Sequence, residues 1–243
     1  MNKQVAPILG VSFSTRSFPE TVADLTNRIE AGQSTHVVTA NPEMVMIARA
    51  NETLQKILEQ AYVVPDGIGI VYAAKWLRQP ITERIAGIEL LEALMAQANE
   101  RKWKVYLLGA SPESNRLARE RLAQRYPQAQ IVGSRDGYFR AEDEPEIIRE
   151  ITSLQPDILF VAMGAPRQEE WIAAYREQLQ VPLTMGVGGS FDVIGGRVKR
   201  APVFWQKLHL EWFYRLLKQP SRWKRQLAIP LFVLTVWREK LSR

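Results

Sequence analysis

The sequence predicts an α/β protein, in which a Rossmann-like, mostly parallel sheet is flanked by helices and followed by a basic, amphipathic helical appendage. Short apolar segments alternate with longer helical segments along most of the chain. Strands separated by helices in this way are joined by right-handed crossovers, so they run parallel within one sheet. The segment DILFVAMG at 157–164 is almost entirely apolar, which is typical of a strand covered on both faces.

Six segments have the length and composition of strands. Most are rich in β-branched or large apolar residues, and most end at residues that favour turns. In chain order we expect strands in HVVTA (36–40), YVVPD (62–66), KVYLLGA (104–110), AQIVGSRDG (129–137), DILFVAMG (157–164) and PLTMGVGG (182–189).

Helices fill the intervals between these strands. The clearest begins at Ser111, because serine is a good N-cap and Pro112 suits the first helical position, and it extends to about Arg125. The other helical segments lie near 18–32, 42–60, 67–78, 88–101, 144–153 and 167–178.

The composition limits the class of protein. The 243 residues are 46% hydrophobic and 24% charged, as in ordinary globular proteins, and none is a cysteine. Disulfides and thiolate metal sites are therefore excluded. The N-terminus lacks the apolar core of a signal peptide, and no stretch reaches the ~18 apolar residues of a spanning helix. We expect a cytoplasmic protein that does not cross the membrane.

Charge divides the chain into two parts. Residues 197–243 hold 12 Lys and Arg but two acidic residues, whereas residues 1–196 hold 20 basic and 24 acidic residues. Four of the seven tryptophans also lie in the C-terminal part. A basic, aromatic segment indicates an anionic partner. We expect a Rossmann-like catalytic domain at 1–196 and, at 197–243, a helical appendage that docks on a membrane and can complete the active site.

The appendage has the pattern of an interfacial helix. Apolar side chains share one helical face, and basic side chains lie towards the other: Trp205, Leu208, Trp212, Phe213, Leu216 and Leu217 against Lys207, Arg215 and Lys218. LAIPLFVLTVW (227–237) follows, interrupted by Pro230 and too short to span a bilayer. Trp-rich and basic amphipathic helices bind membrane surfaces. The structural alternative is a helix pair packed on the body. Nucleic acid is a less suitable partner, because the apolar segment would bind it poorly. An apolar face would also suit a homo-oligomer.

Candidate site residues follow the expected strands, because ligands of open α/β sheets bind beyond the carboxyl ends of the strands. Glycines there let backbone N–H groups approach a ligand, and helix N-termini suit phosphate. One acid, one cation and several neutral hydrogen-bonding groups are the equipment for group transfer by a general base. The candidates are Asp66, Thr39, Asn41, Arg84, Gln168, Gly109, Gly186 and Gly188.

Each of these candidates also has a structural interpretation. Asn41 and Asp66 each precede a helix and could be its N-cap. Arg84 could be half of a surface ion pair, and Gln168 could be a polar residue in a first helical turn. GVGGSFD (186–192) lacks the Rossmann spacing, so it is either a tight turn or a diphosphate cradle. Both kinds of interpretation stay open at this point.

Motifs of several other sites are absent from the sequence. It contains no GxGxxG, no GxxxxGK[ST] and no GxSxG. The only histidines, His36 and His209, lack metal-ligand spacing, and there is no DxD pair to chelate a magnesium–diphosphate. We therefore expect no metal and no cofactor, and a structural role for His36.

Seven motifs occur along the chain in a specific order: TANPEM, PDGIGI, ERIAGIELLE, YLLGASPE, GAPRQEEWI, GVGGSFDVIGGRVKRAP and LEWFYRLLKQPSRWKR. Together they resemble the motifs of the WecG/TagA/CpsF glycosyltransferases, an inverting family with a compact Rossmann-like fold. The resemblance extends from about residue 8 to 230, and the ordered set is specific although each motif alone is weak.

The resemblance implies a transferase that moves N-acetylmannosamine from UDP-N-acetylmannosamine to the 4-hydroxyl of undecaprenyl-diphosphate-linked N-acetylglucosamine. It implies inversion, no metal, and peripheral attachment to an anionic membrane surface at the inner face, in wall teichoic acid linkage-unit synthesis. Another UDP-sugar, such as N-acetylmannosaminuronic acid, is the alternative within the family, for exopolysaccharide or common-antigen synthesis. A non-catalytic, membrane-docked nucleotide-binding module is the alternative from another class.

The resemblance also assigns roles to individual residues. Asp66 of the PDG motif matches the family's catalytic base. Four candidates match its substrate-binding positions: Thr39, Asn41, Arg84 and Gln168. Three arginines of the appendage match those thought to meet the donor diphosphate: Arg215, Arg222 and Arg225.

Overall fold

The computed structural model describes residues 4–198, 201–202, 204–205, 214 and 227–242. Its main sheet has six strands in the order β4-β3-β8-β7-β5-β6, and every neighbouring pair is parallel. This confirms the predicted fold class and all six predicted strands, which are β3 (Thr35–Ala40), β4 (Tyr62–Pro65), β5 (Lys104–Gly109), β6 (Gln130–Arg135), β7 (Ile158–Ala162) and β8 (Leu183–Gly186).

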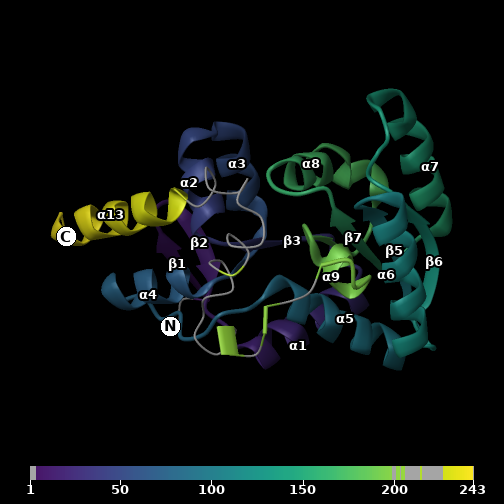
Figure 1. Cartoon of the computed structure of the whole chain (residues 1–243), viewed down its shortest axis with the longest axis horizontal. Helices are drawn as coiled ribbons and strands as arrows, with labels where there is room; N and C mark the ends of the chain where they lie inside the picture. Colours follow the sequence, from purple (N-terminus) through teal and green to yellow (C-terminus); the bar gives the residue numbers. More distant parts are fainter. Residues whose placement is uncertain (1–3, 199–200, 203, 206–213, 215–226, 243) are drawn as a thin grey trace.

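Helices cover both faces of this sheet (Figure 1). One face packs against α1 (Phe18–Glu30), α5 (Gly87–Arg101), α6 (Pro112–Arg125) and the short α9 (Ser190–Ile194). The other packs against α2 (Pro42–Ala50), α3 (Glu52–Gln60), α4 (Ile68–Trp76), α7 (Glu144–Leu154), which the 3-10 turn η1 (Ala141–Asp143) precedes, and α8 (Arg167–Leu179).

The strands are apolar on both sides because both of their faces are buried. In β5, Val105 and Leu107 pack towards α5 and α6, whereas Tyr106 and Leu108 pack towards α7 and α8. All four side chains are fully buried. This alternation is the period of two expected for a strand between two helical layers.

The predicted helix over 42–60 is two helices, so that prediction was wrong in its continuity. Asn51 ends α2 and begins α3 with an extended backbone, at φ −132° and ψ 100°. Its Oδ1 accepts a hydrogen bond from the Leu54 N–H at 3.1 Å. Asparagine is a strong N-cap, and the cap interrupts a segment whose apolar period is otherwise helical.

An N-terminal hairpin of β1 (Val5–Ile8) and β2 (Val11–Ser14) was not predicted. Leu9 and Gly10 form its two-residue turn with φ of 49° and 88°, the positive values that such turns require. The hairpin buries Ala6, Ile8, Val11 and Phe13 in the core that α2, α3 and α4 share. It therefore extends the helical layer that covers β3 and β4.

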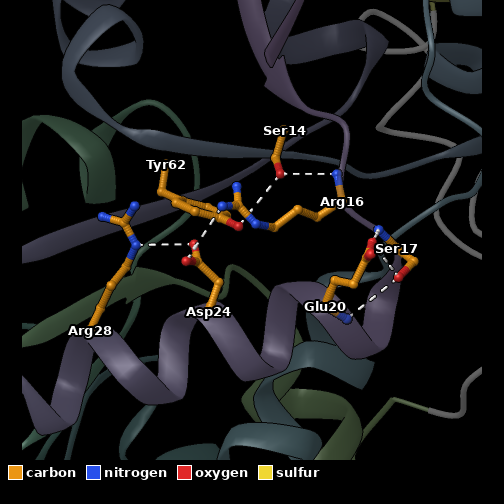
Figure 2. Close-up of polar contacts among 7 residues, drawn as sticks. All are labelled: Ser14, Arg16, Ser17, Glu20, Asp24, Arg28 and Tyr62. Atoms are coloured by element: carbon orange, nitrogen blue, oxygen red, sulfur yellow. Dashed lines mark hydrogen bonds and ion pairs between the residues drawn. The ribbon is translucent and has the colours of Figure 1, made fainter. Parts of the chain in front are cut away.

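A polar cluster joins the end of this hairpin to α1 and to β4 (Figure 2). The Ser14 hydroxyl donates to the Tyr62 hydroxyl at 3.5 Å, and Asp24 pairs with Arg16 at 3.6 Å and with Arg28 at 3.1 Å. The Arg28 guanidinium lies 5.2 Å from the centre of the Tyr62 ring, and burial raises the pKa of Tyr62. The cluster anchors the amino end of β4, the strand whose other end leads to Asp66.

The last helix, α13 (Ala228–Leu241), packs on α2 and α4 (Figure 1). Phe232 and Val236 are 2% and 1% exposed and belong to the same core as the hairpin. The expected interruption at Pro230 was wrong, because this proline lies in the first turn, where its missing N–H is not needed. In the described ranges, no helix combines the length and hydropathy needed to cross a membrane.

Candidate active site

The carboxyl ends of all six parallel strands lie at one edge of the sheet, as predicted. Ala40 pairs with Pro65, so Asn41 and Asp66 follow neighbouring strand ends. The Asp66 N–H donates to the Ala40 carbonyl at 2.9 Å. The structure therefore brings these two predicted site residues together.

Gly67, not Asp66, occupies the N-cap position of α4, and its φ is 89°. The interpretation of Asp66 as the N-cap was therefore wrong. A Cβ on Gly67 would meet Pro42 Cδ at 3.6 Å, and a Cβ on Gly69 would meet Pro42 Cγ at 2.7 Å. Because glycine at position 69 allows this close approach, α2 packs directly against the start of α4, beside the corner that carries Asp66.

Asn41 is the N-cap of α2, as its structural interpretation predicted. Its Oδ1 accepts from the Met44 N–H at 2.9 Å, so Nδ2 is the atom through which it can donate to a ligand. The structural interpretation of Arg84 is also confirmed, since its guanidinium lies 3.7 Å from Glu89. The neighbouring Ile85 N–H donates to the Pro65 carbonyl at 2.8 Å, which places the Arg84 segment beside the end of β4.

Thr39 lies on β3 and faces α5. A Cβ on Gly87 would lie 3.0 Å from the Thr39 hydroxyl oxygen, so the glycine at the start of α5 leaves room for this side chain. Thr39 is half-buried one residue before the end of its strand. It is therefore close to the rim without being at its edge.

Gln168 is buried and joins two loops. Its Oε1 accepts from the Gly164 N–H and the Gly188 N–H, each at 3.0 Å, and its Nε2 donates to Glu169 Oε1 at 2.7 Å. Burial raises the pKa of the Glu169 carboxyl to about 7. Gln168 is thus bonded to protein at both ends of its amide in this structure.

Two of the three predicted ligand-binding glycines, Gly109 and Gly186, lie at close packing contacts, and the third, Gly188, has a φ of 50°. A Cβ on Gly109 would lie 2.5 Å from the Ala162 carbonyl oxygen, and one on Gly186 would lie 2.4 Å from Gln168 Nε2. The Gly188 N–H is engaged by Gln168. Packing explains glycine at positions 109 and 186, and the positive φ explains it at position 188. The role of the three residues in ligand binding stays a prediction.

A cavity of about 430 Å³ opens at the ends of β5, β6 and β7. Arg197 Nη1 donates to the Ser111 hydroxyl at 2.8 Å, and the Ser114 hydroxyl donates to Asp192 at 2.5 Å. Asp192 and Arg197 were not among the predicted site residues, although GVGGSFD contains the former. The lining residues are Ala110, Ser111, Gly137, Tyr138, Ala162, Met163, Arg167, Asp192, Arg197 and Val198.

The cavity and Asp66 lie at different positions along the same rim. From β4, which leads to Asp66, the sheet order reaches β7 after three strand spacings and β5 after four. At ~4.8 Å per spacing the separation is roughly 14–19 Å. This arrangement suits an elongated ligand with one end in the cavity and a reacting group near Asp66.

The predicted appendage arginines, Arg215, Arg222 and Arg225, lie outside the described residues. Their role in binding a diphosphate stays a prediction from the resemblance.

His36 lies at the start of β3, outside the rim, as its predicted structural role requires. It is buried, and within the described part of the chain its Nε2 has no hydrogen-bond partner. Burial, helped by the positive charge of Arg176, lowers the pKa of His36 to about 3. The folded protein therefore keeps this imidazole neutral.

We expect His36 to make the fold sensitive to acid. The unfolded imidazole binds a proton below about pH 6.5, whereas the folded one stays neutral down to about pH 3. The free energy of unfolding is therefore highest above pH ~6.5, and the contribution of His36 lowers it by about 2–3 kcal/mol between pH 7 and 4.5. Urea unfolding at both pH values should show a smaller loss in His36→Gln than in the wild type. Equal losses would contradict this assignment.

Comparisons with known proteins agree on one family. The model of the glycosyl transferase WecG/TagA/CpsF family matches residues 6–243. A Bacillus spizizenii protein named N-acetylglucosaminyldiphosphoundecaprenol N-acetyl-beta-D-mannosaminyltransferase is 38% identical over 235 residues, which cover 96% of this chain and 91% of that protein. A Staphylococcus aureus protein of the same name is 39% identical over 243 residues, covering 98% and 94%.

Proposed function

The chain belongs to the WecG/TagA/CpsF family of glycosyl transferases, and from this premise we propose that it transfers N-acetylmannosamine from UDP-N-acetylmannosamine to undecaprenyl-diphosphate-linked N-acetylglucosamine. The names of the two relatives describe this sugar and this acceptor. The product would be a lipid-linked disaccharide, which we place in the linkage unit of wall teichoic acid.

The observation that carries the proposal is a fixed carboxylate corner on the same rim as a large cavity. Asp66 follows β4, and the cavity lies three to four strands away, roughly 14–19 Å along the rim. We assign the nucleoside end of the donor to the cavity, where Tyr138 is 78% exposed and its ring can stack on a base. The sugar then extends towards Asp66.

Asp66 acts in this proposal as the general base. It removes the proton from the 4-hydroxyl of the acceptor sugar while that oxygen attacks the anomeric carbon of the donor. The bond between this carbon and the UDP oxygen breaks, UDP leaves with the electron pair, and the configuration inverts. Asn41 Nδ2 and Thr39 belong to the proposed binding surface around this step, whereas Gln168 lies beside the cavity and its amide is bonded to Gly164, Gly188 and Glu169.

The departing diphosphate requires positive charge or aligned N–H donors. Arginine suits this task, because its planar fork meets two phosphate oxygens at once. Within the described residues, Arg167 and Arg197 line the cavity, and Arg84 lies near Asp66. The proposal adds Arg215, Arg222 and Arg225 of the appendage and assigns no role to a metal.

A donor panel tests the proposed function. The chain is incubated with a lipid-diphosphate-N-acetylglucosamine analogue and with UDP-N-acetylmannosamine, UDP-N-acetylmannosaminuronic acid or UDP-N-acetylglucosamine. We expect a β-linked N-acetylmannosaminyl product on the 4-hydroxyl, identified by mass and by NMR. Product from the uronic acid donor alone would favour the alternative donor. UDP binding without any product would favour the non-catalytic module.

We also propose that the reaction takes place on a membrane surface. The outward face of α13 exposes Leu231, Leu234 and Trp237, and the adjacent α4 exposes Tyr72 and Trp76. Both helices carry basic residues in their last turns. Apolar and aromatic side chains beside basic ones favour an anionic lipid interface. The division into a catalytic part at 1–196 and a docking appendage at 197–243 belongs to this proposal.

A further inference from the structure

Glu169 is a buried acid on the rim that the proposed reaction does not use. It lies in the first turn of α8 and is 1% exposed. Its Oε1 accepts from Gln168 Nε2 at 2.7 Å, and among the described residues its Oε2 has no hydrogen-bond partner. A buried carboxyl is costly, so its presence here needs an explanation.

The contact with Glu169 determines which way the Gln168 amide points. The ionised Glu169 carboxylate only accepts hydrogen bonds, so Gln168 must turn Nε2 towards it and Oε1 away from it. Oε1 then accepts from the Gly164 and Gly188 N–H groups. In the flipped amide, Nε2 would face two N–H donors and Oε1 would face the carboxylate, so all three contacts would be repulsive.

The two glycines belong to the two corners beside the cavity. Gly164 lies between β7 and α8, next to the lining residue Met163, and Gly188 lies between β8 and α9. Their φ values are 77° and 50°, which glycine adopts easily but does not fix by itself, because it has no side chain to restrict its backbone. A hydrogen bond from each to the same oxygen holds the corners at a fixed separation.

We propose that Glu169 is a positioning residue: it orients the Gln168 amide, and through it holds the Gly164 and Gly188 corners where the donor cavity requires them. The identity of the donor rests on the proposed function, whereas the positioning role of Glu169 rests on the hydrogen bonds alone. We call the Gln168 amide, bonded to Gly164, Gly188 and Glu169, the clamp. Glu169 itself touches no reacting atom.

An exchange of the two side chains tests the proposal at pH 8. Gln168→Glu places two carboxyl groups together and removes the donor between them. In the double variant Gln168→Glu/Glu169→Gln, the carboxylate at position 168 can accept from both glycines, and the amide at position 169 can donate to it. All three hydrogen bonds are kept, and only the bond between the side chains of residues 168 and 169 changes its direction. Glu177→Gln, which neutralises an exposed acid on the same helix, is the matched control.

Two readouts are measured for each variant: hydrogen exchange of the Gly164 and Gly188 amides by NMR, and the Kd of UDP by calorimetry. We expect Gln168→Glu to speed both exchange rates and to weaken UDP about 10-fold or more, as loss of a charge-assisted hydrogen bond does. The double variant should recover wild-type exchange and bind UDP within about threefold of the wild type. Glu177→Gln should change neither readout.

Three outcomes would overturn the proposal. Unchanged exchange in Gln168→Glu would mean that the contact with Glu169 does not determine how the side chain at position 168 holds the glycines. Failure of the double variant to recover exchange would mean that Glu169 does not orient the amide. Recovered exchange with UDP binding still weak would assign Gln168 to direct ligand contact. A wild type that binds no UDP would instead overturn the proposed function, and the exchange rates would still decide the clamp.

Discussion

Asp66→Asn is expected to lower sugar transfer by roughly 10²–10⁴-fold, the usual loss when a general base is removed. Asparagine has nearly the same shape, but its amide cannot take the proton of the acceptor hydroxyl. The corner itself should persist, because Gly67 and Gly69 pack on Pro42 independently of the carboxylate. UDP release in the presence of acceptor measures the effect, and the Kd of UDP should stay close to that of the wild type.

The matched control is Asp143→Asn, which also replaces an aspartate by its neutral amide. Asp143 follows β6, at the edge of the sheet opposite to β4. Asp143 lies in η1 and accepts from the Arg140 N–H at 2.8 Å, a contact that an asparagine oxygen can replace. Turnover of this variant should equal that of the wild type. If Asp66→Asn were as active as the control, the base would have to be sought elsewhere on the rim.

We expect substitutions on the exposed face of α13 to weaken membrane binding, and substitutions on its buried face to lower the free energy of unfolding. Trp237 is 54% exposed, so Trp237→Ser removes an apolar side chain from the proposed docking face without opening the core. Burying a large apolar side chain contributes about 1.5–3 kcal/mol, so we expect roughly 10-fold or more weaker binding to vesicles containing anionic lipid. Co-sedimentation with vesicles measures this, and the free energy of unfolding should not change.

Phe232→Ala is the control from the opposite face of the same helix. Phe232 is buried between α13 and the body, and truncation of a buried phenylalanine costs about 3–5 kcal/mol of stability. Urea unfolding should detect this loss. If Trp237→Ser bound vesicles as well as the wild type, the outward face of α13 would not be the docking surface.

The order of strands and helices could be predicted because both depend on local patterns. Apolar strands such as 157–164 are buried on both faces, and Ser111-Pro112 begins α6 as its capping chemistry requires. Once the strands are known to be parallel, their carboxyl ends must share one rim. The placement of Asn41 and Asp66 on one rim follows from this rule, whereas their proximity depends on the pairing of β3 with β4.

Features that depend on tertiary contacts or on a single residue were missed. The hairpin turn uses Leu9 where asparagine or glycine would have signalled it, and Asn51 divides a segment whose period is continuously helical. The Gln168 amide joins Gly164 to Gly188, which lies 24 residues further along the chain, so no local pattern indicates this contact. Asp192 and Arg197 enter the cavity only because α9 packs on α6.

We propose that this chain transfers a sugar to a lipid-linked acceptor without a metal. The most direct measurement is UDP release from UDP-N-acetylmannosamine, with and without a lipid-diphosphate-N-acetylglucosamine analogue, in excess chelator. We predict release that requires the acceptor and is unaffected by the chelator. Release that is independent of the acceptor, or abolished by the chelator, would contradict the claim.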